Sequence, residues 1–592
     1  MKKIKKSLCL VLTFIMIFSS CIVFSSAAEE RAIYVPDYDT ETPVIIVHGM
    51  SQNNTYLCDE NGEWAKDADG NYIYGWPLHI ELKALLKAVP ALLKSIITRQ
   101  DAGLSDALYT AAHEALYVIE KDNEGNYVNN IDVPCYECPM SELPESVKEE
   151  YYTFLPIQEL GELIGEDMVY YFGYDSLGDV VSTADRLYNY IHNVVLPQTG
   201  ADQVKICPIS LGGTVATYYL NEHPEDYSLI KKMVYVEPAI DGSNIIGDLL
   251  TNNLSVYDDE ELYSNILVGI LGETPLAYLL NMVLRILPSD VLKSALNGLV
   301  NGVVDIAALR SPIIWALCPS DYYEQARAIW LENDELSVIR EKADAFQEAR
   351  ANFEDNLAAL RATGTEVFDI VCYDVNLFPL CKDYKTTNAD RVIHAASTSM
   401  GATFADLGTT LGEGYEAAGT YCDNPNHNHL SPDGVVDATT GLLPCTTWYF
   451  KGQAHELLPL NDVALELAIR SMVDDNIKDV YSNPAYPQFN NGRLTDKTTL
   501  YITTWEEADK SKVSADDKAA IEAAVATVKA LDEETIVDID AWKQAEADLG
   551  NALYAAGLIE NPNPGFLESA LTTVLKTANK CVNTAFEKFI KE

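Results

Sequence analysis

The segment QVKICPISLGGTVATYYL, residues 203–220, decides the fold that we expect for this chain. An apolar run that favours a β-strand is followed by a turn around Ser210 and then by a helical pattern. In such a strand–turn–helix unit the serine stands on a strained turn with its hydroxyl group exposed. Gly212 permits close approach of another backbone, and Gly213 lets the start of the helix pack tightly. Pro208 stands where the G-x-S-x-G pattern has glycine, and it removes one hydrogen-bond donor.

The N-terminal residues have the pattern of a secretory signal. Four lysines precede an apolar run over residues 8–24, and Ser26-Ala27-Ala28 forms a small-residue cleavage site. We therefore expect residues 1–28 to be removed and the mature protein to be secreted and extracellular. Lipid attachment at Cys21 is the alternative, but Phe18-Ser19-Ser20 matches a lipoprotein signal poorly.

The chain is strongly acidic and long. It has 592 residues, 41 lysines and arginines against 89 acidic residues, and a net charge of −48. Such a charge repels nucleic acid and anionic membrane surfaces, so we expect no nucleic-acid partner. Even the apolar stretch 264–287 is interrupted by Glu273, Pro275 and Arg285, and we expect no integral membrane segment in the mature chain. The length indicates more than one domain, or one domain with large insertions.

Further strand patterns accompany the segment around Ser210. Each is a short apolar run rich in β-favouring residues, and several are separated by helical patterns, as at residues 179–195. Alternating strands and helices predict a mostly parallel α/β sheet. These strands are expected at residues 44–47, 168–172, 233–236, 366–373 and 446–450.

Three motifs together resemble a known family. They are V-I-I-V-H-G-M at residues 44–50, F-G-Y-D at 172–175 and I-S-L-G-G-T at 209–214. In this order and spacing they resemble α/β-hydrolases of the lipase and esterase type, including relatives of lecithin:cholesterol acyltransferase. The resemblance covers about residues 40–480 and implies an α/β-hydrolase fold.

The resemblance implies a division of the chain. The α/β-hydrolase domain would span residues 29–495, with an insertion at 51–165 after the His-Gly loop and a large helical cap at 241–361. Apolar residues of the cap either line an acyl pocket or pack on one another. Residues 496–592 favour helices and resemble a small helical module of the kind that attaches secreted enzymes to surfaces. We expect three helices there, packed by Ile521, Val525, Val528, Leu531, Trp542, Leu549 and Leu553.

The resemblance also implies a serine hydrolase site. Ser210 would be the nucleophile, and His455, which follows the last expected strand, the general base. Asp390, in N-A-D-R-V-I, matches the segment that carries the acid in this family, and the chain order Ser, Asp, His is the one that this fold uses. The backbone N–H groups of Met50 and Leu211 would form the oxyanion hole. Three other acids remain alternatives to Asp390: Asp374, Asp433 and Asp437.

Cysteine and histidine residues gather in the loop 408–445. Cys422 and Cys445 are expected to form a disulfide, with His427 and His429 exposed, because a secreted chain permits disulfides. A Cys2His2 zinc site is the alternative, as is a calcium site at Asp433 and Asp437, but the spacing matches no strong metal signature. We therefore expect no metal.

Four other cysteines have simpler interpretations. Cys135-x-x-Cys138 has no matching second pair, which favours a disulfide or two unrelated thiols over a metal. Cys207 and Cys372 lie in expected strands, where a buried free thiol is the usual state.

The sequence thus predicts a secreted serine hydrolase that cleaves carboxylic esters. Its substrate would be a small-molecule or lipid ester, and the apolar cap weakly favours a hydrophobic ester over a sugar acetate. The chemistry needs no cofactor. Acyl transfer to an alcohol and amide cleavage use the same acyl-enzyme and are alternatives within this fold. A non-catalytic surface-binding module is the alternative outside enzymes.

Overall fold

The structure, a computed structural model, describes most of the chain. The expected signal at residues 1–28, part of the expected cap and the end of the expected helical module lie outside the described residues. The described residues are 34–77, 87–258, 281–282, 284–419, 421–422, 424, 426–483, 485–490, 496–508, 510–533 and 539–559.

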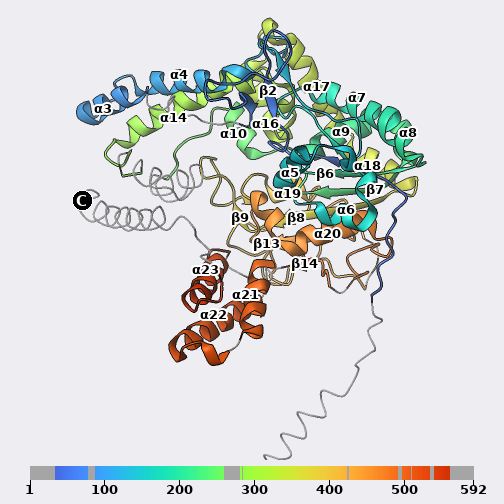
Figure 1. Cartoon of the computed structure of the whole chain (residues 1–592). Coiled ribbons are helices and arrows are strands. Elements are labelled where there is room, and N and C mark those ends of the chain that lie inside the picture. The colour runs from blue at the N-terminus through green and yellow to red at the C-terminus, as the bar shows by residue number, and fades with distance from the viewer. Residues whose placement is uncertain are drawn as a thin grey trace, which may run out of the picture. The chain divides into compact units, whose positions relative to one another are not determined.

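A seven-stranded sheet organises the chain (Figure 1). Its order is β14-β13-β8-β7-β6-β1-β5, and every neighbouring pair is parallel. The inner strands are buried on both faces, which is why they are mostly apolar in the sequence, and the lysines of β6 and β7 lie in the first half of each strand. The expected α/β class with a parallel sheet is confirmed. The strands are β1 (Val44–Val47), β5 (Val169–Phe172), β6 (Val204–Pro208), β7 (Ile230–Val236), β8 (Glu366–Tyr373), β13 (Thr447–Lys451) and β14 (Phe489–Asn490).

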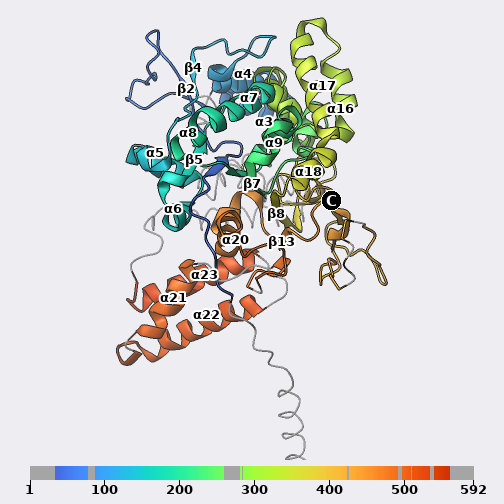
Figure 2. The ribbon, with the colours of Figure 1, turned by 90° about the vertical axis from the view of Figure 1, so that its right-hand side faces the viewer.

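Helices cover both faces of the sheet. Figures 1 and 2 show α7 and α9 on one face, where α17 and α18 also pack, and α6 and α20 on the other. The two groups bury the apolar strand side chains in one large core. Their bounds are α7 (Val180–Tyr190), α9 (Leu211–Glu222), α17 (Ser337–Ala351), α18 (Phe353–Ala362), α6 (Gln158–Ile164) and α20 (Asp462–Val473).

The insertion after β1 contains helices and a small sheet. Its first described helices are α3 (Val89–Thr98), which residues 78–86 outside the description precede, and α4 (Leu104–Leu116). The sequence patterns did not indicate the antiparallel sheet β3-β2-β4. Its strands, and a further helix of the insertion, are β2 (Thr55–Leu57), β3 (Tyr74–Trp76), β4 (Ile131–Asp132) and α5 (Glu145–Phe154).

The described part of the expected cap is mostly helical. Its α14 packs on α4 of the insertion, and two glycines make the close approach possible: a Cβ on Gly298 would lie 2.2 Å from the Ser105 carbonyl oxygen, and one on Gly302 2.7 Å from Ala112 Cβ. Residues 259–280 and 283 lie outside the described part. The described helices are α10 (Asn244–Leu250), α14 (Ser289–Val303), α15 (Pro312–Ala316) and α16 (Ser320–Trp330).

One helical stretch in the described residues is long and apolar enough to cross a membrane. It is Ser289–Ala308, and half of it is buried inside the protein, so its apolar residues also serve the helix packing described above.

The C-terminal helices have a hydrophobic core of their own. They are α21 (Asp496–Glu507), α22 (Ala515–Glu533) and α23 (Ile539–Ala555). Of the expected core residues, four are fully buried and two pack against them partly buried, while the Trp542 side chain lies outside the description. Tyr501 and Trp505 of α21 join this core. The fully buried residues of the expected core are Ile521, Val528, Leu549 and Leu553, and the partly buried ones are Val525 and Leu531. The domain boundary at residue 495 remains a prediction.

Candidate active site

Ser210 occupies the turn between β6 and α9. Its backbone has φ 50° and ψ −113°, which is a strained conformation for a residue with a side chain. The Ser210 N–H donates to the Val236 carbonyl oxygen at 2.9 Å, which ties the turn to β7. A Cβ on Gly212 would lie 2.1 Å from the Val47 carbonyl oxygen, and one on Gly213 2.5 Å from a Pro238 side-chain carbon. Both glycines are therefore required by close packing, as the sequence pattern indicated.

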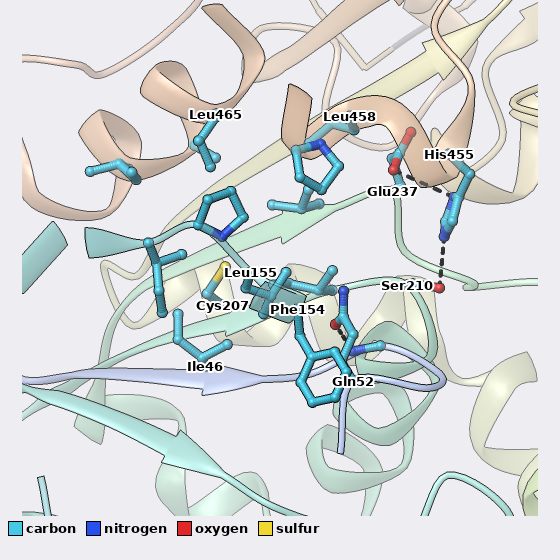
Figure 3. Close-up of a pocket in the computed structure, with 18 of the residues that line it drawn as sticks. Ile46, Gln52, Phe154, Leu155, Cys207, Ser210, Glu237, His455, Leu458 and Leu465 are labelled. Carbon is cyan, nitrogen blue, oxygen red and sulfur yellow. Dashed lines mark hydrogen bonds and ion pairs between the residues drawn. The ribbon is translucent and has the colours of Figure 1, made fainter. Parts of the chain in front are cut away.

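His455 lies directly beside this serine. It begins the short 3-10 helix η10 (His455–Leu460) that follows β13. Its Nε2 is 3.0 Å from Ser210 Oγ, and its Nδ1 is 2.8 Å from Asp390 Oδ2. Figure 3 shows the imidazole pointing at the serine hydroxyl. The structure thus joins the three residues that the family resemblance had selected.

Asp390 is fully buried and firmly oriented. It follows β10 (Asn388–Ala389), and its Oδ1 accepts hydrogen bonds from the N–H groups of Val392 and Ile393 at 2.9 and 2.6 Å. Its backbone oxygen accepts the N–H of His455 at 2.8 Å. Two independent bonds therefore hold His455 against Asp390, one to the ring and one to the backbone.

The three alternative acids are engaged elsewhere. Asp374 and Asp433 both form ion pairs with Lys451, at 3.3 and 2.7 Å. Asp437 holds its own loop, accepting hydrogen bonds from Tyr415 and from the Ala418 N–H. Of Asp390 and these three alternatives, only Asp390 forms a hydrogen bond with His455.

Glu237 is a residue of the site that the sequence patterns did not single out. It ends β7 with φ 46°, its side chain is 4 % exposed, and its Oε2 lies 3.4 Å from His455 Nδ1. Its Oε1 is buried without a hydrogen-bond partner. The only available signal was its position, since a polar residue at the end of a strand beside the serine-bearing strand faces the same sheet edge.

The two carboxyl groups change the electrostatics of the imidazole. Burial by itself lowers the pKa of His455, but the negative charges of Asp390 and Glu237 outweigh it and raise that pKa above its ordinary value. Burial, reinforced by the charge of Asp390, raises the pKa of Glu237 despite the opposing effect of His455. Glu237 therefore holds a proton more readily than an ordinary glutamate does.

The loop after β1 lies against the serine. A Cβ on Gly49 would be 3.1 Å from Ser210 Cβ, and the Gly49 N–H donates to Gln52 Oε1 at 2.6 Å. The buried His48 orders this loop, because its Nδ1 lies 2.6 Å from the Gly49 carbonyl oxygen and its Nε2 accepts the Tyr174 N–H. Burial lowers the pKa of His48 to about 4, so the ring is neutral.

Two backbone N–H groups next to the serine remain available. Among the described residues, neither the N–H of Met50 nor that of Leu211 donates a hydrogen bond to the protein. Leu211 is the first residue of α9, where backbone N–H groups and the helix dipole favour negative charge. These are the two N–H groups that the family resemblance implied for an oxyanion hole.

A cavity of about 260 Å³ opens at Ser210. Its walls are mostly apolar and come from the end of α5, from η10 and from α20 (Figure 3). No described residue of the cap at 241–361 lines it, so the expectation that the cap forms an acyl pocket is not met there. The apolar lining comes instead from Phe154, Leu155, Ile157, Leu458, Leu465, Ala468, Ile469 and Met472.

The pairing of the cysteines differs from the expectation. Cys207 and Cys372 are buried free thiols, as expected, but Cys422 and Cys445 are free as well, with their sulfur atoms 3.4 Å apart. Cys135 and Cys138 are also free, so the disulfide expected at 422–445 and the one considered at 135–138 are both absent from the structure.

Two groups of side chains in the described residues have ligand atoms close enough for a metal ion. One is Glu237, Asp390 and His455. The other is Cys422, His427, His429 and Cys445. In the first group, Asp390 already receives two backbone N–H bonds and His455 faces Ser210, an arrangement suited to proton transfer.

Comparisons with known proteins do not identify a family for this chain. Neither a protein-family model nor a curated protein matches the sequence. Among solved structures, one chain of the crystal structure of the Tle4–Tli4 complex aligns with 73 % of this chain and 97 % of its own length, at 12 % identity and a TM-score of 0.28. At this level the likeness identifies neither a family nor an activity.

Proposed function

We propose that the protein is an α/β-hydrolase that cleaves carboxylic esters through an acyl-enzyme on Ser210. The observation that carries the proposal is the hydrogen-bonded series Ser210, His455, Asp390 at the carboxyl edge of a parallel sheet. A serine on a strained turn, bonded to an imidazole that a buried carboxylate orients, is the arrangement that activates a hydroxyl group as a nucleophile.

The reaction would follow from these positions. Ser210 Oγ attacks the ester carbonyl carbon while His455 Nε2 takes the hydroxyl proton, which it then gives to the departing alcohol. Asp390 keeps the Nδ1 proton of His455 directed away from the serine and stabilises the imidazolium. A water molecule, deprotonated by His455, then releases the acid and restores Ser210.

The oxyanion would lie between the free N–H groups of Met50 and Leu211. Removing one donor of this kind costs about 3 kcal/mol of transition-state stabilisation in comparable enzymes. Because Gln52 holds Gly49 and His48 holds the same loop, the Met50 N–H is positioned before substrate arrives.

The cavity favours an apolar acyl group. Its lining from α20 and the end of α5 offers few polar partners, and about 260 Å³ is just below the range of about 300–1,000 Å³ that is typical of small-molecule sites. We therefore expect an ester with a medium acyl chain to be hydrolysed faster than either an acetate or a palmitate.

Location and attachment complete the proposal. Residues 1–28 would direct secretion, and the helices from residue 496 onward would serve as a spacer or an attachment module, with no part in catalysis. Proteomic detection of the mature N-terminus in the culture medium tests the first point.

The function is tested with p-nitrophenyl esters from acetate to palmitate and with a fluorophosphonate probe. The mature protein should hydrolyse the esters and be labelled at Ser210, and Ser210→Ala should lose both properties. Labelling without ester hydrolysis would indicate an amidase or an acyltransferase. Absence of labelling in a correctly folded protein would contradict the proposal and favour a binding module.

A further inference from the structure

Four side chains from one loop and the start of β13 meet away from the candidate active site. Cys422, His427 and His429 belong to the loop before β12 (Val436–Asp437), and Cys445 lies two residues before β13. Their ligand atoms, two Sγ, one Nδ1 and one Nε2, all lie within 4.8 Å of one another. We call this set the cysteine–histidine cluster.

The distances between these atoms match a tetrahedral metal site. Cys422 Sγ lies 3.5 Å from His427 Nδ1, and Cys445 Sγ lies 3.6 Å from His429 Nε2 and 3.7 Å from His427 Nδ1. The two sulfur atoms are 3.4 Å apart. Ligands at about 2.3 Å (sulfur) and about 2.0–2.1 Å (nitrogen) from a tetrahedral zinc ion have sulfur and nitrogen atoms roughly 3.5–3.6 Å apart, close to the distances here, and two sulfur atoms roughly 3.8 Å apart, so zinc would move the two sulfur atoms slightly apart.

We propose that the cysteine–histidine cluster binds one Zn²⁺ ion as a structural site. Two thiolates and two neutral imidazoles form a soft, four-ligand set of the kind that closed zinc sites use. A disulfide would account for the two cysteines but not for two imidazole nitrogen atoms turned toward the same sulfur atoms. A disulfide also requires the sulfur atoms to be about 2.05 Å apart.

The residues around His429 support its orientation as a metal ligand. His429 is buried, and its Nδ1 lies 2.8 Å from Gln488 Oε1, which suits an imidazole that donates through Nδ1 and binds a metal through Nε2. Gln488 is fixed by its own amide, which donates to the carbonyl oxygens of Pro444 and Thr447. The Asn424 amide nitrogen is 2.8 Å from His427 Nε2, and because zinc bound at Nδ1 leaves the proton on Nε2, this amide would have to turn away when the ion binds.

The position of the cluster suggests what the ion would do. With four protein ligands no coordination position remains for a substrate, which indicates a structural role. The ion would tie the loop at 422–429 to Cys445, and through Gln488 to the segment leading into β14. Since β13 begins at Thr447 and leads to His455, zinc would stabilise the strand that precedes the candidate general base. The inference itself does not depend on the proposed esterase function.

The first test is the metal content of the full mature protein. We expect one zinc ion per chain by elemental mass spectrometry after purification from zinc-supplied cells without chelator. Cys445→Ser and His429→Ala should lose it, whereas Cys58→Ser, which changes another partly exposed free cysteine, should keep it. Zinc retained in both cluster variants, or no zinc in the unmodified protein, would overturn the proposal.

Three further measurements serve even if a cluster variant fails to fold. Replacing zinc with Co²⁺ in the unmodified protein should produce thiolate-to-cobalt charge-transfer absorption and the intense d–d bands of a tetrahedral ion. Peptide mapping without reduction should find Cys422 and Cys445 as thiols, and a disulfide between them in zinc-supplied protein would refute the site. Gln488→Ala should weaken zinc binding about 10- to 100-fold in a chelator competition, because it removes the partner of His429.

Discussion

The candidate active site and the cysteine–histidine cluster are both small groups of side chains at contact distance, but they are assembled differently. Ser210 and His455 are 245 residues apart in the sequence, and each follows a strand of one parallel sheet. The cluster comes from residues 422–445, within one loop and its junction with β13. The comparison shows that a distant pair can be more predictable than a local one, because parallel strands bring their carboxyl ends to a common edge whatever lies between them.

The largest expected effect separates the two sites completely. Ser210→Ala should reduce kcat/KM for ester hydrolysis on the order of 10⁶-fold, because it removes the nucleophile. Zinc content and melting temperature should stay those of the unmodified protein, since the cluster shares no residue with the site. A variant that loses zinc together with activity would show that the two sites are coupled, contrary to this description.

A second prediction concerns the choice of acid. Asp390→Asn should lower kcat about 10⁴-fold, because an amide stabilises the wrong tautomer of His455. Asp374→Asn is the matched control: its carboxyl group pairs with Lys451, and its loss should change kcat by less than about 10-fold. Steady-state kinetics on one ester decides between them, and equal losses would remove Asp390 from its assigned role.

Removing zinc should act on stability. A ligand present at about 1,000 times its dissociation constant adds about 4 kcal/mol to the folded state, so chelation should lower the melting temperature by about 5 °C. Calorimetry before and after treatment with a strong chelator, then after zinc is restored, measures the effect. Cys445→Ser should be insensitive to the chelator, and a chelator effect of equal size in that variant would place the ion elsewhere.

Glu237 should be visible in the pH dependence. His455 acts as a base only when it is neutral, so activity falls as the pH drops through its pKa. Because the pKa of His455 is raised, the acid limb of the pH profile should lie above the pH of about 6.5 that is expected for an ordinary histidine. Glu237→Gln removes the negative charge that Glu237 carries when ionised and should move the limb to lower pH, by less than about one unit because the raised pKa of Glu237 leaves that charge only partly present. Glu456→Gln, at the exposed neighbour of His455, should move it much less, because water screens that charge. Profiles of kcat/KM against pH distinguish the two.

The smallest expected effect concerns acyl-chain length. Leu465→Trp fills the cavity from α20 and should reduce the preference for medium over short esters about 10-fold, as the loss of a few methylene contacts implies. Val463→Trp, on the same helix but outside the cavity lining, is the control. An unchanged preference in Leu465→Trp would mean that the acyl chain binds elsewhere.

The parallel sheet was predictable because its strands are buried on both faces. Such strands appear as unbroken apolar runs, as in Val44–Val47 and Val169–Phe172, and the helical stretches between them require parallel connections. The antiparallel sheet β3-β2-β4 was missed because its strands are two or three residues long and only partly apolar. Short strands leave too little periodicity to recognise.

The sequence by itself determined which residues stand at strand ends, because that depends on local apolar runs and on the glycines after Ser210. Together with the family resemblance, it could therefore propose Ser210 and His455 as neighbours. Only the tertiary structure decided that Asp390 rather than Asp374 faces the imidazole, that Glu237 adds a second carboxyl group, and that α20 lines the cavity. It also decided that Cys422 and Cys445 meet two imidazoles. These outcomes depend on how loops and helices pack across long separations, where contact geometry rather than local periodicity sets which groups meet.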